Sequence, residues 1–176
     1  TYQRSSVAVE GNVADKRFYS RYYPRRLQAE VLLDAVSQVT GVSSVFKDRE
    51  QGTRALQLPD SSVDSYFLST FGRPDRIITC ECERTDEPSV TQVLHLYNGD
   101  TLNQKLQSNE GRIEDLFSQK TPAAVAVKTA YLDALSREPT ELEMQRLVAI
   151  LDSEANLAEK RLVLEDLYWS LLTSKE

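Results

Sequence analysis

The chain has 176 residues, of which 40% are hydrophobic and 27% are charged, and its formal net charge is −6. This length allows one domain with its own hydrophobic core, and the composition excludes a disordered chain. No run of the roughly 20 apolar residues that a membrane span needs is present. Because the sequence starts at Thr1 and its single methionine is Met144, we expect a fragment of a larger multidomain protein.

The first 24 residues read as a basic aromatic arm. Residues 1–26 have a net charge of +4, so the remainder of the chain carries −10. The acidic residues of this segment are Glu10 and Asp15, and its six basic residues are Arg4, Lys16, Arg17, Arg21, Arg25 and Arg26. We expect the arm to lie on its own acidic body or on a preceding domain. A polyanion contact through stacked Arg and Tyr side chains is the alternative. Since an acidic body repels phosphate backbones, we expect no nucleic-acid partner.

Residues 25–40 are predicted to form the central helix. Pro24 suits a helix start, and Gly41 suits a left-handed helix end. The apolar residues cover a wide arc of the helical wheel, which predicts burial on most sides: Leu27, Val31, Leu32, Ala35, Val36 and Val39. Glu30 and Asp34 lie on the narrow polar side of this helix.

A long ordered central loop is expected after this helix. Residues 42–60 are polar and irregular, and residues 62–70 suit one or two helical turns with Val63, Tyr66 and Phe67 inward. Residues 72–74 predict a turn. Residues 77–83 are the one extended candidate, since β-branched side chains favour an extended chain, but no partner strand is evident.

Helices are predicted again from residue 86 onward. Asp86 or Glu87 caps the first of them, with Pro88 in its first turn, and the apolar positions 90, 93, 94 and 97 form one stripe before Asn98 and Gly99 close it. Short helices are expected near residues 102–106 and 113–117. The last third predicts three helices, from 121 to about 135, from 140 to about 152 and from 156 to about 173, with capping boxes at Thr140 and Asn156.

The predicted fold is therefore all-α, an irregular helical bundle with a long ordered central loop. We expect a single domain over residues 1–176. It consists of the arm (1–24), the central helix, loop and short helices (25–120) and a C-terminal three-helix unit (121–176).

Two segments carry a family resemblance, YYPRRLQAEVLLDAVSQVTG (22–41) and FGRPDRIITCECERTDEPSVTQVLHLYNGDTLN (71–103). Together they resemble the C-terminal domain of unknown function of large planctomycete proteins, which often carry a cytochrome-c-like domain near the N-terminus. The resemblance runs over nearly the whole chain. It implies a periplasmic or other extracytoplasmic location and upstream domains of the same polypeptide, but no activity.

Cys80, Cys82 and His95 are the candidate residues for redox or metal chemistry. In an extended segment both cysteines point to one face, where they could hold a metal or form a strained, easily reduced disulfide. Ordinary thiols are the favoured interpretation, because a zinc site usually needs C-x(2–4)-C and a second ligand pair. In remoter relatives the loop holds one cysteine before its arginine, so the CEC of this chain departs from the pattern. His95 is expected to be a surface or interface histidine.

Glu30 and Asp34 are the other polar candidates. Two carboxylates one helical turn apart repel each other unless a cation lies between them. We favour a buried network that pins the loop onto the central helix, with partners among Arg25, Arg26, Arg73, Arg76 and Arg84. A catalytic carboxylate pair is the alternative.

The functional prediction is a structural or interaction module, with no assigned catalytic residue and no cofactor. Its expected partners are the upstream domains of the same polypeptide, or else other proteins. The alternative is a redox- or metal-dependent activity centred on the loop of Cys80 and Cys82. The sequence contains no C-x-x-C-H haem attachment motif and no G-x-S-x-G nucleophile motif.

Overall fold

A computed structural model describes residues 5–15, 17–59, 63–74 and 88–174. These ranges contain helices and no strand, which confirms the all-α prediction. In chain order the elements are α1 (Ala29–Thr40), the 3-10 helix η1 (Ala55–Gln57), α2 (Tyr66–Thr70), α3 (Val90–Asn98), α4 (Asp100–Leu106), α5 (Arg112–Ser118), α6 (Ala123–Leu135), α7 (Glu141–Ser153) and α8 (Leu157–Thr173).

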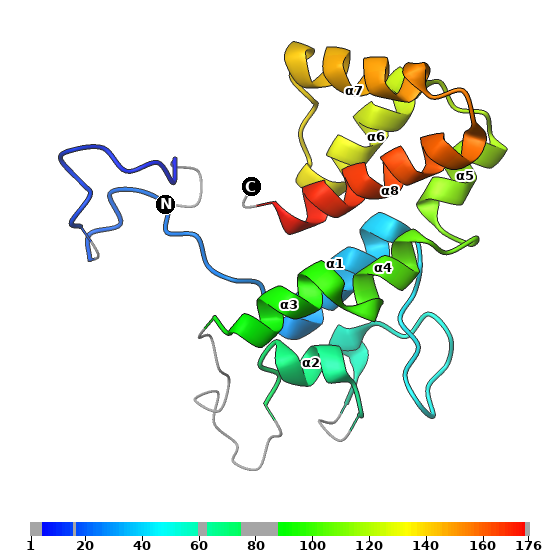
Figure 1. The fold of residues 1–176 in the computed structure, drawn as a ribbon. Helices are drawn as coiled ribbons and strands as arrows, with labels where there is room; N and C mark the ends of the chain where they lie inside the picture. Colours follow the sequence, from blue (N-terminus) through cyan, green and yellow to red (C-terminus); the bar gives the residue numbers. More distant parts are fainter. Residues whose placement is uncertain (1–4, 16, 60–62, 75–87, 175–176) are drawn as a thin grey trace.

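Helix α1 lies between the two halves of the helical body (Figure 1), in contact with η1, α2, α4 and α5. It begins at Ala29 and not at Arg25, because Gln28 is extended and Leu27 is 56% exposed, so the first predicted turn has nothing to pack against. It ends at Gly41, whose φ of 74° is the left-handed cap that the sequence predicted.

Helix α1 contributes side chains to two hydrophobic clusters. Its first half contributes Ala29 and Leu33 to a cluster with the loop after α1, η1 and α2. Its second half contributes Val36 and Val39 to a larger cluster formed with α4–α8. Because one rigid helix carries side chains into both clusters, it fixes the position of each relative to the other.

The C-terminal three-helix unit is formed by α6, α7 and α8, each in contact with the other two. Thr140 and Glu143 form the predicted capping box of α7. Asn156 caps α8 through a bond from the amide of Ala158, and not through the box with Glu159 that the sequence suggested. No helix in the described ranges has both the length and the apolar character needed to cross a bilayer.

Helix α3 differs from its prediction in its start and in its packed face. It begins at Val90 with Ser89 as its cap, and Ser89 and Gln92 form a capping box, so Pro88 lies before the cap and not in the first turn. Its apolar stripe points outward, and Val90, the most exposed member, is 75% exposed. Similarly, Tyr66 in α2 was expected inward but is 64% exposed, whereas Phe67 is buried as predicted.

Candidate functional site

Glu30 and Arg73 form an ion pair in the interior. The Arg73 Nε lies 3.5 Å from the Glu30 Oε1, and the two side chains are only 6% and 9% exposed. Arg73 follows α2 and Glu30 lies in the first turn of α1, so the pair joins the segment after α2 to α1. An ion pair this deep is costly to break, because removing one partner leaves the other charge buried.

Asp34, one turn further along α1, has a separate set of partners. Its Oδ1 accepts a hydrogen bond from the Ala55 amide at 2.7 Å, and its Oδ2 accepts one from the Leu56 amide at 3.2 Å. Arg54 lies 3.5 Å from the same carboxylate. These amides begin the 3-10 helix η1 and have no partner within it, so Asp34 satisfies donors that would otherwise be buried without an acceptor.

Arg26 contacts a different part of the molecule, the side chain of Gln92 on α3. Its guanidinium donates to the Gln92 Oε1, while the Gln92 Nε2 donates to the carbonyl of Thr70 at 2.9 Å. Gln92 is 5% exposed, so this amide connects the base of the arm, the end of α2 and α3. Arg25 is exposed, and no described residue forms an ion pair with it.

The predicted polar candidates are thus only partly brought together by the structure. Glu30 pairs with Arg73, Asp34 caps η1, and Arg26 bonds to Gln92, so these are three separate contacts. Arg76 and Arg84 lie outside the described residues. Arg54 and Gln92 were not among the candidates, because an arginine in an irregular loop and a glutamine in a helix carry no signal of their partners.

His95 is partly buried, and its ring is packed against aromatic rings. Its ring centroid lies 5.3 to 6.0 Å from those of Tyr66, Phe67 and Phe71, and its Nε2 lies 3.1 Å from the Thr101 Oγ1. Burial lowers the pKa of His95, an effect that the charge of Asp100 partly opposes. The ring therefore favours its neutral form at the junction of α2, α3 and α4.

The redox and metal candidates cannot be assembled from the described ranges. Cys80 and Cys82 lie outside them, so the pairing of these thiols with His95 stays a prediction. Within the described ranges no group of three or more His, Cys, Asp or Glu side chains is placed to hold a metal ion.

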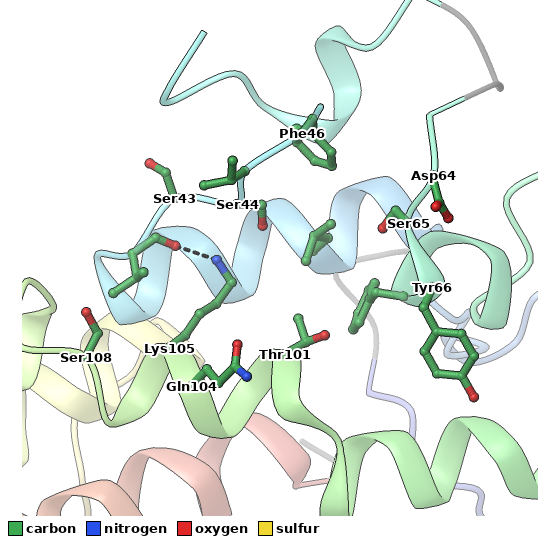
Figure 2. A pocket seen from close by; sticks show the side chains of 14 residues that line it. Ser43, Ser44, Phe46, Asp64, Ser65, Tyr66, Thr101, Gln104, Lys105 and Ser108 are labelled. Atoms are coloured by element: carbon green, nitrogen blue, oxygen red, sulfur yellow. Dashed lines mark hydrogen bonds between the residues drawn. The ribbon is translucent and has the colours of Figure 1, made fainter. Parts of the chain in front are cut away.

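A groove lies between the loop after α1, the start of α2, and α4 (Figure 2), with a volume of about 440 Å³. Lys105 of α4 lines it and is 7% exposed. Its Nζ donates a hydrogen bond to the carbonyl of Val42 at 2.7 Å. Burial lowers the pKa of Lys105 to about 8, and the charge of Asp34 opposes part of this shift. The burial of Lys105 could not be predicted from the sequence, because a lone lysine in a short helix usually has a solvated side chain.

The arm forms a small hydrogen-bonded loop of its own. The Asp15 carboxylate accepts from the amides of Arg17, Phe18 and Ser20 and from the Ser20 hydroxyl. These bonds hold the pKa of Asp15 well below its usual range, and the bond from the Phe18 amide has the largest effect. Tyr22 closes the loop by donating its amide to the carbonyl of Ser5.

This loop extends away from the helices (Figure 1), so the described part of the arm does not lie on the acidic body. Phe18 is 86% exposed at its tip. The arm and the outer face of α3 both expose apolar side chains, and the hydrogen bond between Arg26 and Gln92 links the base of one to the other.

Comparison with known proteins places this chain in a family. No curated protein and no solved structure matches the chain. A family model described as "PSD1: Protein of unknown function (DUF1553)" matches residues 1–151, which is most of the chain. The chain belongs to this family of proteins of unknown function.

Proposed function

We propose that this chain is a non-catalytic docking module, which binds other domains of its own polypeptide through the arm and the outer face of α3. The observation that carries the proposal is the orientation of α3. Its apolar side chains Val90, Val93, Leu94 and Tyr97 are 75%, 51%, 55% and 53% exposed. Its inward side holds Leu96 together with the polar Gln92 and His95, and the Tyr97 ring lies edge-on to Trp169 of α8.

Such an orientation opposes the usual arrangement of a surface helix, whose apolar stripe faces the core. A contiguous exposed apolar patch of this kind typically marks a surface that another protein covers. Gln92 explains why the helix stays in this orientation, since its side chain is held by Thr70, Ser89 and Arg26. These hydrogen bonds of Gln92 therefore hold α3 with its apolar stripe facing outward.

The arm suggests the chemistry of the partner. It is basic overall by sequence, and its exposed side chains include Phe18 and Tyr19. A partner that is acidic and partly apolar complements both properties, and aromatic residues with arginine are the groups that dominate binding energy at interfaces.

The wider context of the proposal comes from the resemblance of the two sequence segments. We place the module at the C-terminal end of a large extracytoplasmic protein of the planctomycete type, with a cytochrome-c-like domain upstream. The full sequence of the parent protein tests this directly. An upstream C-x-x-C-H segment and a secretory signal peptide are expected, and a cytoplasmic parent without them contradicts the proposal.

The docking itself is tested by hydroxyl-radical footprinting of the chain alone and within its parent protein. We expect Phe18, Leu94 and Tyr97 to lose reactivity in the parent, because the partner domain covers them. Ile150 on α7 is 47% exposed and serves as the internal control that keeps its reactivity. Equal reactivity of the three side chains in both samples refutes the proposal.

A further inference from the structure

The groove beside Lys105 is lined by both apolar and polar side chains, with Lys105 toward one end and Asp64 toward the other. Phe46 and Phe67 line it and are buried, while Tyr66 is exposed at its edge. Its volume of about 440 Å³ falls within the roughly 300–1,000 Å³ of small-molecule sites. Hydroxyl groups of Ser43 and Ser44 lie along the same groove.

Lys105 is the cationic end of this groove. It is almost wholly buried, and among the described residues its Nζ has one hydrogen-bond acceptor, the neutral carbonyl of Val42. No described carboxylate forms a salt bridge with it. A buried ammonium usually requires a paired anion, because one neutral acceptor does not replace the water that the charge has lost. The lowered pKa of Lys105 reflects the same deficit.

Asp64 is the anionic end. Figure 2 shows Asp64 and Lys105 toward opposite ends of the groove, with the Tyr66 ring on the same rim as Asp64 but directed away from its carboxylate. Asp64 is exposed and forms no salt bridge with a described residue. An exposed carboxylate at the end of a groove is a suitable partner for an ammonium group, since opposite charges attract.

We propose that this groove binds a small zwitterionic ligand, with the ligand carboxylate at Lys105 and the ligand ammonium at Asp64. The carboxylate supplies the anion that the buried lysine lacks. Phe46 and Phe67 then contact the hydrocarbon stem between the two charges of the ligand. Ser43 and Ser44 offer hydroxyl donors to the ligand carboxylate. Free amino acids with a long stem and the two termini of a short peptide share this chemistry.

A series of zwitterions of increasing length tests the proposal on the whole chain. The probes are 4-aminobutyrate, 6-aminohexanoate, 8-aminooctanoate and triglycine, and hexanoate and hexylamine carry one charge each. Binding is followed by amide chemical shifts in NMR spectra. We expect at least one zwitterion to bind about tenfold more tightly than either single-charge probe, with shifts concentrated in residues 42–46, 64–67 and 101–108.

The identity of the tightest probe distinguishes the two sources of ligand. Tightest binding by triglycine assigns the groove to peptide termini, and tightest binding by an ω-amino acid assigns it to free amino acids. If no zwitterion binds more tightly than hexanoate and hexylamine, the proposal is wrong.

Variants at the two ends provide the second test. Asp64→Asn removes only an exposed charge, so it tests the groove without disturbing the interior. It should reduce the affinity of the tightest zwitterion about tenfold while leaving hexanoate binding unchanged. Lys105→Met should reduce both, and Lys128→Met, an exposed lysine on α6, is the matched control. Unchanged zwitterion affinity in Asp64→Asn overturns the assignment.

Discussion

Two buried carboxylates one turn apart on α1 are stable because each has its own positive partner. Glu30 pairs with Arg73, while Asp34 lies beside Arg54 and accepts two amide hydrogen bonds from η1. The repulsion that the i, i+4 spacing predicts is thereby offset at each residue separately. The polar strip of α1 thus attaches the chain segments on either side of α2 to one helix.

Asp34→Ala should lower the free energy of unfolding by about 3 kcal/mol, because two amides at the start of η1 lose a charged acceptor. Asp34→Asn should cost less, since it keeps one carbonyl acceptor. Asp152→Ala, which removes an exposed carboxylate on α7, is the control and should stay within about 0.5 kcal/mol. Urea unfolding measures all three variants, and equal effects of Asp34→Ala and Asp152→Ala would contradict this role.

His95 is the single histidine of the chain, so its protonation can be followed without interference from another imidazole. Its pKa is lowered by burial, which means that the folded state binds the proton less readily than the unfolded chain. The contribution of His95 to stability is therefore complete at pH values above its usual pKa of about 6.5, and it is lost as the pH falls below that value.

We therefore expect the free energy of unfolding to decrease between about pH 6.5 and pH 5 in the wild type. A His95→Gln variant lacks the titrating ring and should decrease less over the same interval. Denaturant unfolding at a series of pH values gives both slopes. Identical slopes in the two proteins would show that His95 is not linked to folding.

Some of these contacts could be predicted from the sequence and others could not. Arg73 was predicted only as one of five possible arginine partners of Glu30 and Asp34, because carboxylates on an otherwise apolar helix need positive charges nearby. The Asp34 contact could not be predicted, since its partners are main-chain amides 21 and 22 residues away. Their position depends on how the irregular loop folds, which no residue pattern determines. Lys105 was missed for a similar reason, because its burial comes from the loop at Val42.

At the scale of elements, α3 shows the limit of reading a helix from periodicity. The spacing of Val90, Val93, Leu94 and Tyr97 correctly predicts a helix, but it does not say which side packs on the rest of the chain. Gln92 decides this through its hydrogen bonds to residues of three segments. Gly99 then allows α4 to follow directly, because a Cβ there would lie 2.1 Å from the His95 carbonyl oxygen.

A matched pair of leucines tests the orientation of α3. Leu68→Ala in α2 removes a side chain that is 1% exposed and should cost about 2–5 kcal/mol. Leu94→Ala in α3 removes one that is 55% exposed and should change stability by less than about 0.5 kcal/mol. Thermal and urea unfolding provide the comparison. A large loss of stability in Leu94→Ala would mean that the apolar stripe of α3 packs inward.

The C-terminal helices were the most predictable elements. Thr140 and Glu143 form a local capping box, and the connections are short, so the contacts of α6, α7 and α8 follow from neighbouring residues. The start of α1 was less predictable. Pro24 permits a helix at Arg25, but residues 25–28 lead toward the arm and lack the packing that would hold them in a helical turn.

At the scale of the whole molecule, the chain consists of a helical body organised around α1 and an arm that extends from it. The two hydrophobic clusters account for the body, and the sequence predicted only some of their members, among them Val36, Val39 and Phe67. The direction of the arm was not predictable, because charge asymmetry favours contact with an acidic surface without saying whose surface it is. The outward stripe of α3 favours another domain as the partner.

Calorimetric titration of this chain with the upstream domains that we propose for its parent protein, at low and at physiological salt, tests the docking claim most directly. We expect saturable binding that weakens with salt, because the arm is basic, and that is lost in a Leu94→Glu variant. Ile150→Glu, an equally exposed position on α7, should bind as the wild type does. No binding at low salt, or full binding by Leu94→Glu, would contradict the account.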